Sequence, residues 1–353
     1  MSSPRLAIII LNYNGYKDTI ACLESVCSAP PRGCVAIVVD NFSPDDSVAQ
    51  LKRWMQNYRP PLRQSAWSEM AKSCTTNHGQ AGGQPRVVLL EAKNNSGFSG
   101  GNNLGIRYAL QLGAAWILLL NNDSIVECDS LERLVDGAER SGAQLAGCTV
   151  YEYADASKAW YLGGKFNWWG DKDLRHLPRR ATQAEGAIET DWITGCCMLI
   201  KREVFERIGL LDENSFLYFE DADFCRRAAS AGFRRVLLLG SKIYHKAGRS
   251  VGREPALACY HATRSRVYFH RKHYSFSAHA SFLVIFSLSR CLRACGWLLQ
   301  GRPDLGSASL RGLWDGMLSR KAPGAGHSCE SGNPPSAAEV DPRLRGGDEI
   351  GGE

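Results

Sequence analysis

Short apolar runs alternate with amphipathic stretches over the first 150 residues of the chain. The runs are rich in Ile, Val and Leu, as is typical of parallel strands that are covered on both faces. The predicted strands are Leu6 to Leu11, Val35 to Val39, Arg86 to Leu90 and Trp116 to Leu120. Between them, apolar residues recur at spacings of three and four, which predicts helices. This alternation predicts βαβ units and an α/β fold with a doubly wound sheet.

Polar residues come directly after each of the four predicted strands. A carboxylate such as Asp40 at a strand end can bind a ribose diol or a base, although Asp40, Asn41 and Ser43 are also residue types that cap a turn. In open α/β sheets, ligands bind in the crevice beyond the carboxyl ends of the strands, so four polar clusters in succession predict a site. The clusters are Asn12-Tyr13-Asn14, Asp40-Asn41, Asn94-Asn95 and Asn121-Asn122-Asp123.

The segment from Asn94 to Gly105 is rich in glycine and lies between a predicted strand and a predicted helix. Glycines let the backbone approach a ligand closely, and amides at a helix N-terminus suit phosphate. The segment contains neither Gly-x-Gly-x-x-Gly nor a following Gly-Lys-Ser/Thr, which excludes the dinucleotide fingerprint and the phosphate loop. It predicts either a phosphate-binding turn of another kind or a tight turn that packs a helix on the sheet.

Three further residues stand where they could carry chemistry. Asp123 follows an apolar strand, where an oxygen ligand could hold Mg²⁺ or Mn²⁺. Asp221 opens a helical pattern, and the helix dipole keeps a carboxylate there ionised. His245 follows the apolar run Arg235 to Leu239. Helix-start carboxylates and single histidines are also common in proteins without any such role, so the residues alone leave both interpretations open.

Composition narrows the choice of protein class. The 42 basic and 36 acidic residues among 353 leave a net charge of +6, a mild bias that favours anionic partners in general. Composition excludes collagen, a coiled coil, wholesale disorder and a bundle of transmembrane helices. None of the 13 cysteines lies in a Cys-x-x-Cys motif, and no segment resembles a signal peptide. Reduced thiols in a cytoplasmic enzyme are therefore expected.

Six groups of motifs occur in a fixed order along the chain. They are Asn12-Tyr13-Asn14; Val39-Asp40-Asn41-x-Ser43; Asn95-x-Gly97-Phe98-x-Gly100-Gly101-Asn102-Asn103-x-Gly105; Leu120-Asn121-Asn122-Asp123; Trp192 to Ile200 followed by Phe219-Glu220-Asp221-x-Asp223; and Tyr244-His245-x-x-Gly248-x-Ser250. The ordered set resembles the family 2 glycosyltransferases with the GT-A fold, and bacterial rhamnosyltransferases of cell-surface polysaccharide synthesis in particular. The resemblance covers residues 5 to 275.

The resemblance implies a fold and a reaction. The fold is a mixed, mostly parallel Rossmann-like sheet flanked by helices, with a C-terminal helical annex. The reaction is an inverting single displacement, assisted by Mg²⁺ or Mn²⁺, that moves a sugar from a nucleoside-diphospho-sugar to a hydroxyl of a glycan or lipid-linked glycan. Rhamnose from dTDP-rhamnose is the best match for the donor, and no nucleic acid is expected as a partner.

The resemblance also implies roles for individual residues. Asp221 is the expected general base. Glu220 and Asp223 belong to the same catalytic group, in which Asp223 is expected to orient neighbouring groups or the acceptor. Asp123 and His245 are expected to hold the metal, and Asn121 replaces an aspartate of the family's Asp-x-Asp motif, which leaves one carboxylate on the cation. The expected acceptor-binding residues are Trp192 and Gly195. The expected nucleotide-sugar-binding residues are Asn12, Tyr13, Asn14, Asp40, Asn41, Ser43, Asn95, Gly97, Phe98, Gly100, Asn102, Asn121 and Asn122.

Two other functions fit parts of the pattern. One is a different nucleotide-sugar enzyme of the nucleotidyltransferase type, although no basic glycine-rich loop lies near the start of the chain. The other is a non-catalytic nucleotide-sugar-binding module, which would be expected to lack the set of Asp123, Asp221 and His245.

The expected domains are a catalytic domain over residues 1–260 with a surface insertion at 60–86, a helical annex over 261–320 and a disordered tail over 321–353. Residues 331–348 resemble translated repetitive DNA. In the annex, Arg290 and Arg293 follow an apolar run, which favours a helix lying at a membrane interface over a spanning one. A core-packing helix with a basic face fits equally well. The expected location is the cytoplasm, at the inner face of the cell membrane.

Overall fold

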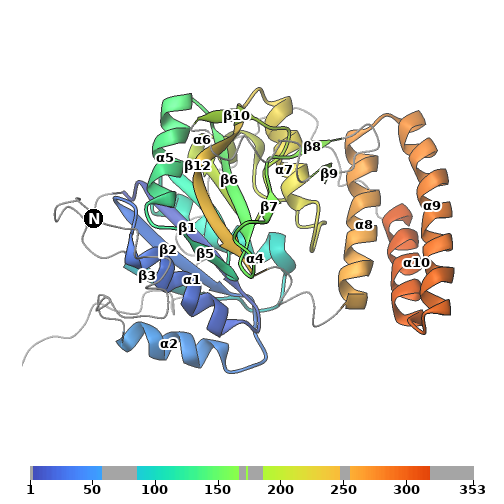
Figure 1. The fold of residues 1–353 in the computed structure, drawn as a ribbon, viewed down its shortest axis with the longest axis horizontal. Helices are drawn as coiled ribbons and strands as arrows, with labels where there is room; N and C mark the ends of the chain where they lie inside the picture. Colours follow the sequence, from blue (N-terminus) through green and yellow to red (C-terminus); the bar gives the residue numbers. More distant parts are fainter. Residues whose placement is uncertain (1–2, 58–85, 167–171, 174–185, 247–254, 319–353) are drawn as a thin grey trace, which may run out of the picture. The chain divides into compact units, whose positions relative to one another are not determined.

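The computed structural model describes residues 3–57, 86–166, 172–173, 186–246 and 255–318 (Figure 1). These residues belong to one compact unit, Met1–Leu318. The predicted insertion, apart from Arg86, and the predicted tail lie outside the described residues.

The four predicted strands form the parallel half of the central sheet, in the order β4-β1-β2-β3. They are β1 (Leu6–Asn12), β2 (Cys34–Asp40), β3 (Arg86–Glu91) and β4 (Trp116–Asn121). Each strand ends one residue later than predicted, on a polar residue. In the register, Asn12 lies beside Asp40, and Leu11 lies beside Asn121. The predicted polar clusters therefore start at one edge of the sheet.

The other half of the sheet is mixed. Strand β11 (Cys197–Lys201) runs antiparallel between β4 and β6 (Leu145–Glu152), and β12 (Arg235–His245) runs parallel to β6. His245 is thus the last residue of a long strand with an irregularity between Leu238 and Lys242, whereas the sequence pattern places it beyond the strand. The remaining strands are β5 (Ser124–Val126), β7 (Ala159–Tyr161) and β10 (Ala187–Glu189) in this sheet, and β8 (Lys165–Phe166) with β9 (Lys172–Asp173) in a separate pair.

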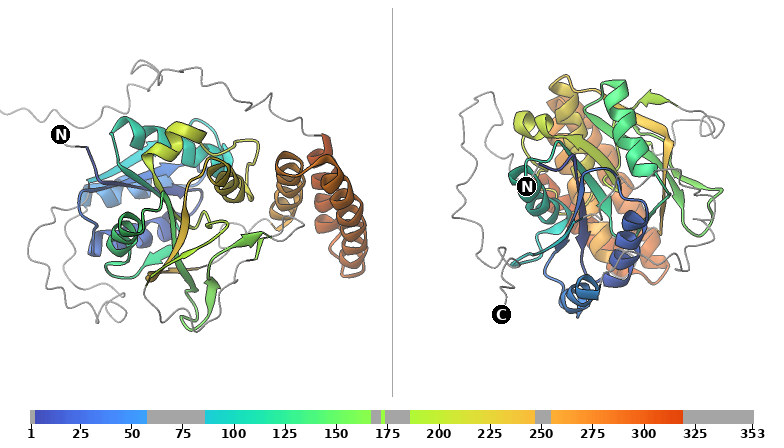
Figure 2. Two further views of the ribbon diagram at one scale, coloured as in Figure 1. Left: turned by 90° about the horizontal axis from the view of Figure 1, so that it is seen from above. Right: turned by 90° about the vertical axis from the view of Figure 1, so that its left-hand side faces the viewer.

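Helices cover both faces of the central sheet, which confirms the expected mixed α/β fold (Figure 2). One face carries α1 (Tyr16–Ser28), α2 (Ser47–Asn57) and α5 (Ser130–Ser141), and the other carries α4 (Gly97–Gln111), α6 (Arg202–Ile208) and α7 (Glu220–Ser230). The strand side chains between them form the core, in which Ile8 and Ile37 are fully buried. Burial on both faces explains the unbroken apolar runs of the sequence.

The glycine-rich segment is mostly helix rather than loop, because α4 already begins at Gly97. A Cβ atom on Gly105 would lie 2.7 Å from Ile9, and one on Gly101 would lie 3.1 Å from the Asn41 side chain. These glycines let α4 pack closely on β1 and on the loop after β2. The helix-packing interpretation of the segment therefore applies beyond Gly97.

The annex consists of α8 (Pro255–His273), α9 (Phe276–Leu299) and α10 (Pro303–Leu318). Val267, Phe282, Phe286 and Leu313 form a small core that joins the three helices. Among the described helices, α9 is the one that by length and composition is apolar enough to cross a membrane, even with its two arginines.

The cysteines mostly follow the expectation. Ten of those in the described residues are free thiols. Cys128 is disulfide-bonded, so the expectation of reduced thiols throughout is wrong at this position.

Candidate active site

Asp40 is the centre of a buried hydrogen-bond network at the ends of β1 and β2. Its Oδ2 accepts from Asn12 Nδ2 and from Ser43 Oγ, both at 2.7 Å, and its Oδ1 accepts from the Ser43 backbone N–H at 2.9 Å. The carboxylate is 1% exposed. Since two carboxylate oxygens offer about four acceptor positions, the bonds shown leave Asp40 capacity for about one further donor. Asn14 joins the network through its backbone N–H, which donates to Ser43 Oγ.

The loop after β2 is tied to the start of α4 by Asn41. Its Nδ2 donates to Asn95 Oδ1 at 2.9 Å and to the Gly97 carbonyl at 3.1 Å. Gly97 has a φ of +71°, a left-handed conformation in which glycine avoids the strain of a Cβ atom. The predicted residues Asn41, Asn95 and Gly97 thus lie together, and their hydrogen bonds shape the turn.

The other residues predicted to bind the nucleotide sugar lie in α4 and in the loop between β1 and α1. Asn102 is buried within α4, where its Nδ2 donates to the Phe98 carbonyl at 2.9 Å. Gly100 is also buried in α4, and a Cβ atom there would meet Ser96. Tyr13 is half-buried in the loop between β1 and α1.

Thr19 links two of the predicted clusters, although the sequence analysis did not single it out. Its Oγ1 donates to Asn12 Oδ1 at 2.7 Å and accepts from Asn122 Nδ2 at 3.0 Å. Thr19 lies in the first turn of α1, directly after the cluster that follows β1. That position was the signal available in the sequence.

Asp123, just beyond β4, and His245, the last residue of β12, form a buried pair. His245 Nε2 lies 3.0 Å from Asp123 Oδ1, and the Trp160 ring packs edge-on against the imidazole with centroids 4.8 Å apart. Burial opposes protonation of the ring, but the neighbouring Cys196 and Asp123 outweigh it and raise the pKa of His245 to about 11.

The donor set of this pair fits a divalent cation that is also bound by substrate phosphates. A carboxylate oxygen and an imidazole nitrogen lie side by side, and the buried His245 Nδ1 has no hydrogen-bond partner among the described residues. Mg²⁺ is commonly held by one or two carboxylates together with phosphate oxygens. Within the part of the chain that the structure describes, no three His, Cys, Asp or Glu side chains form a complete metal site.

Lys246 adds a positive charge beside this pair. Its backbone N–H donates to the Asp123 carbonyl at 3.0 Å, and its Nζ lies 2.7 Å from Asp18 Oδ1. Lys246 was not predicted to have a role. Its position directly after His245 was the signal available in the sequence.

Asp221 lies in the first turn of α7 and is bonded to the loop that precedes β11. Its Oδ2 accepts from the Gly195 backbone N–H at 3.1 Å. The next residue, Cys196, accepts at its carbonyl from the Asn121 N–H at 3.0 Å, and its Sγ lies 3.4 Å from Ser124 Oγ. The loop of Thr194 to Cys196 therefore connects Asp221 with the segment that carries Asp123. Glu220 is buried next to Asp221.

Asp223 faces away from this loop into a cluster of basic side chains. Its Oδ1 lies 2.7 Å from both Lys272 Nζ and His273 Nε2, and its Oδ2 lies 2.8 Å from Arg227 Nε. Burial opposes its ionisation, but the His273 hydrogen bond and the charges of Arg227 and Lys272 hold the pKa of Asp223 well below its usual value. Both oxygens of Asp223 are engaged by these basic side chains, which fix its carboxylate in place.

Trp192, which is expected at the acceptor, is enclosed by its neighbours. Its side chain is 1% exposed, it packs on Tyr161 with ring centroids 5.5 Å apart, and Gly164 lies against the indole. Gly195, the other residue expected at the acceptor, lies between Phe98 and Asp221.

The chain matches a glycosyltransferase family and is similar to named glycosyltransferases. Residues 4–269 match the family described as glycosyltransferase like family 2. The chain is 25% identical over 226 residues to the low-salt glycan biosynthesis hexosyltransferase of Haloferax volcanii, covering 63% of this chain and 61% of that protein. It is 26% identical over 215 residues to the N-acetylglucosaminyl-diphospho-decaprenol L-rhamnosyltransferase of Mycobacterium tuberculosis, covering 52% of this chain and 70% of that protein.

Two solved structures of sugar-binding proteins have a similar fold. The mannosyltransferase PcManGT from Pyrobaculum calidifontis, in complex with GDP-Man and Mn²⁺, matches with a TM-score of 0.51 at 15% identity, over 90% of this chain and 87% of that one. GalNAc-T7 with UDP, GalNAc and Mn²⁺ matches with a TM-score of 0.55 at 14% identity, over 76% of this chain and 48% of that one. These structural similarities show a shared GT-A fold. The family match covers residues 4–269, most of the chain, and establishes that this chain belongs to glycosyltransferase family 2.

Proposed function

We propose that the protein is an inverting glycosyltransferase that uses a nucleoside-diphospho-sugar, with dTDP-rhamnose as the donor, and a hydroxyl of a glycan or lipid-linked glycan as the acceptor. The similarity to a rhamnosyltransferase that is named for a diphospho-decaprenol acceptor supports both choices. The structural observation that carries the proposal is the connection of Asp123 and His245 to Asp221 through the short loop of Thr194 to Cys196.

Asp221 is the proposed general base. Its carboxylate lies at the N-terminus of α7, where the helix dipole favours the ionised form. A carboxylate can accept the proton of the acceptor hydroxyl while the bond between the anomeric carbon and the diphosphate breaks. The acceptor oxygen then forms the new glycosidic bond, the nucleoside diphosphate leaves with the electron pair, and the anomeric centre is inverted.

The polar networks at the ends of β1, β2 and β4 are proposed to bind the donor. Asp40 is proposed to receive one donor group of the base or ribose, because its carboxylate is fixed by Asn12 and Ser43 and retains acceptor capacity. Asp123 and His245 would hold Mg²⁺ or Mn²⁺, with His245 giving up its proton on binding. A divalent cation supplies stabilisation of the negative charge that develops on the leaving diphosphate.

The test uses purified full-length protein with dTDP-rhamnose, UDP- and GDP-sugars, each with and without Mn²⁺. A donor that binds the folded state raises its melting temperature, so dTDP-rhamnose with Mn²⁺ is expected to give the largest rise. Donor hydrolysis or transfer is then measured for the wild type and for Asp221→Asn, which is expected to lose activity by about 10²- to 10⁴-fold. Full activity of Asp221→Asn would overturn the base assignment, and no response to any nucleotide sugar would overturn the donor class.

We further propose that the annex places the enzyme on the inner face of the cell membrane. The outer face of α9 exposes apolar side chains, and no acidic residue occurs in this helix. Residues 255–318 contain eight basic and two acidic residues, which suits an anionic lipid surface. The opposite face of α9 is packed on α8 and α10 through Phe282 and Phe286, which favours a helix that lies on the bilayer. The exposed residues are Val284, Ile285, Leu288, Leu292, Leu298 and Leu299.

Vesicle flotation tests this placement. The protein is expected to float with vesicles that contain phosphatidylglycerol and to bind pure phosphatidylcholine vesicles less. Leu288→Ser with Leu292→Ser should abolish flotation, whereas Leu257→Ser, an exposed leucine of α8, should not. A wild type that stays with the soluble fraction, or that instead forms a dimer broken by the α9 variant, would overturn the proposal.

A further inference from the structure

The turn that presents Glu220 and Asp221 has a strained backbone. Tyr218 and Phe219, directly before α7, both have a φ of +66°. Two consecutive bulky residues in the left-handed region are energetically costly, and such conformations persist only where the surrounding structure enforces them. The contacts that enforce this conformation therefore bear on the position of Asp221.

Helix α8 of the annex holds the segment that leads into this turn. Ser265 Oγ donates to the Leu217 carbonyl at 3.0 Å, and Arg264 donates to the Asn214 carbonyl at 2.7 Å. Tyr268 OH donates to Asp212 Oδ2 at 2.9 Å. These bonds come from successive turns along one side of α8. The helix therefore holds the segment from Asp212 to Leu217 in place.

Residues on the same side of α8 also contact the first turn of α7. Phe269 packs against Phe219 with ring centroids 5.4 Å apart and joins a buried cluster with Ala222. Further along α8, Lys272 bridges Asp212 and Asp223 at 2.5 and 2.7 Å, and His273 Nε2 lies 2.7 Å from Asp223 Oδ1. Asp223 is two residues from Asp221 on the same helical turn. A displacement of Asp223 therefore rotates or shifts the proposed base.

We propose that α8 is a positioning element of the active site, and that His273 acts through Asp223 to set the orientation of Asp221. Asp223 is then an anchor rather than a proton acceptor, which accounts for the engagement of both its oxygens. The annex thus completes the catalytic site in addition to offering a surface to a membrane. This inference rests on the proposed function of Asp221 as the base.

The test compares His273→Ala, His273→Gln and His279→Ala in the full-length protein, with donor turnover and melting temperature measured for each. His273→Ala is expected to lower kcat by about 10- to 100-fold, since misplacement of a catalytic group by about 1 Å can cost about 100-fold. The KM for the donor should stay within about twofold, because the donor networks lie on other elements. His273→Gln, which can donate a hydrogen bond to Asp223, should restore most of kcat.

His279→Ala is the matched control. His279 lies at the interface of α8 and α9 and contacts His270 and Phe282, away from the acidic turn. It is expected to lower the melting temperature while leaving kcat unchanged. If His273→Ala proves too unstable to purify, Lys272→Gln is measured in the same way, with the same expected loss of kcat.

Three outcomes would overturn the inference: a normal kcat in His273→Ala, a loss of kcat that His273→Gln does not restore, or an equal loss of kcat in His279→Ala. The proposed function fails separately, if Asp221→Asn retains full activity or if no nucleotide sugar is bound or turned over. An inactive Asp221→Asn beside a fully active His273→Ala would leave the base assignment intact and reject the positioning role.

Discussion

The backbone N–H of Gly195 donates to Oδ2 of Asp221 over 3.1 Å, so the loop before β11 and the first turn of α7 share one hydrogen bond at the site. A side chain at position 195 would have little room. A Cβ atom would lie 3.1 Å from the Phe98 ring and 3.6 Å from the Asp221 Cβ. The loop, the start of α4 and the start of α7 therefore meet at this glycine.

Gly195→Ala is expected to lower kcat by about tenfold, because the added methyl must displace the Phe98 ring by a few tenths of an ångström and so disturb the packing beside Asp221. Steady-state kinetics with the donor measures the effect. Gly240→Ala is the control, since a Cβ atom at that glycine of β12 meets nothing within 4 Å. Equal kinetics in the two variants would show that the close approach at Gly195 has no catalytic consequence.

Asp123→Asn is expected to weaken metal binding by about 10- to 100-fold, because the variant retains shape but loses the only carboxylate of the proposed cation pair. Calorimetric titration of the protein with Mn²⁺ in the presence of a nucleoside diphosphate measures the affinity directly. Removal of the metal with a chelator should abolish turnover in the wild type. Chelator-resistant activity would contradict a role for the cation.

Asp223→Asn is expected to reduce the free energy of unfolding by about 3–5 kcal/mol, because it leaves Arg227, Lys272 and His273 without their buried carboxylate partner. Denaturant unfolding followed by circular dichroism measures the change. Asp155→Asn provides the comparison, since Asp155 pairs with Lys158 at the surface and its loss should leave the unfolding midpoint nearly unchanged. Similar midpoints for both variants would contradict the anchoring role of Asp223.

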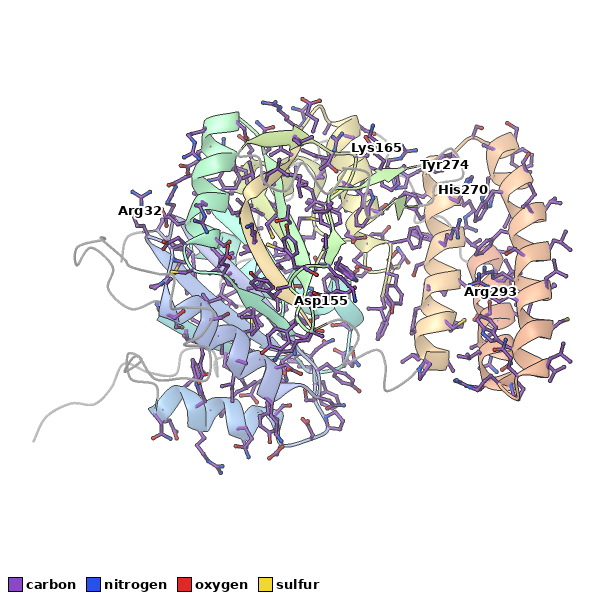
Figure 3. All side chains as sticks on the ribbon, in the orientation of Figure 1. Arg32, Asp155, Lys165, His270, Tyr274 and Arg293 are labelled. Carbon is purple, nitrogen blue, oxygen red and sulfur yellow. The ribbon has the colours of Figure 1, made fainter. Side chains whose placement is uncertain are left out.

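Stability of the annex is expected to fall between pH 6.5 and pH 4 because of His270. His270 lies near Tyr274 at the end of α8 (Figure 3) and stacks on Phe282 with centroids 4.1 Å apart. Burial, and then the charges of His279, Arg266 and Arg226, lower the pKa of His270 to about 4. The unfolded ring titrates near pH 6.5. The stability that depends on the neutral ring is therefore complete above about pH 6.5 and is lost as the pH falls.

Melting temperatures from pH 7.5 to pH 4.5 test this pH dependence. His270→Phe keeps the stacking but cannot be protonated, so its melting temperature should fall less steeply than that of the wild type. Part of the slope should remain, because burial also lowers the pKa of His261 to about 4. Identical slopes for wild type and variant would exclude His270 as a source of the pH dependence.

Apolar periodicity was sufficient to predict the parallel half of the sheet and the helices that cover it. Strands β1, β2 and β4 are present because their continuous Ile, Val and Leu runs reflect burial on both faces. Strand β3 has a similar run, although it lies at the edge of the sheet and most of its side chains are half-buried. The same signal carries no information on strand direction, so the antiparallel β11 between β4 and β6 was not predicted. Likewise, the irregular register of β12 interrupts the pattern and hides the extension of the strand to His245.

The site could be predicted as a set of residue types, but not as a set of contacts. Asn12, Asp40 and Ser43 come together because their strand ends are adjacent, which the sequence order already implies. The bonds from Lys272 and His273 to Asp223 join residues about 50 positions apart, and no local sequence pattern indicates such bonds. For this reason the basic partners of Asp223 were not predicted. The enclosure of Trp192 was not predicted either, since a motif does not reveal which of its side chains are enclosed.

The uneven distribution of charge has a consequence for the effect of ionic strength. Residues 255–318 carry eight of the 42 basic and two of the 36 acidic residues, which leaves 34 of each in the remainder of the chain. The net charge of +6 therefore belongs to the annex. At about 0.15 M salt, charges are screened beyond about 8 Å. Added salt should accordingly detach the enzyme from anionic bilayers while its KM for a nucleotide sugar, set by short-range bonds in a domain of balanced charge, changes little.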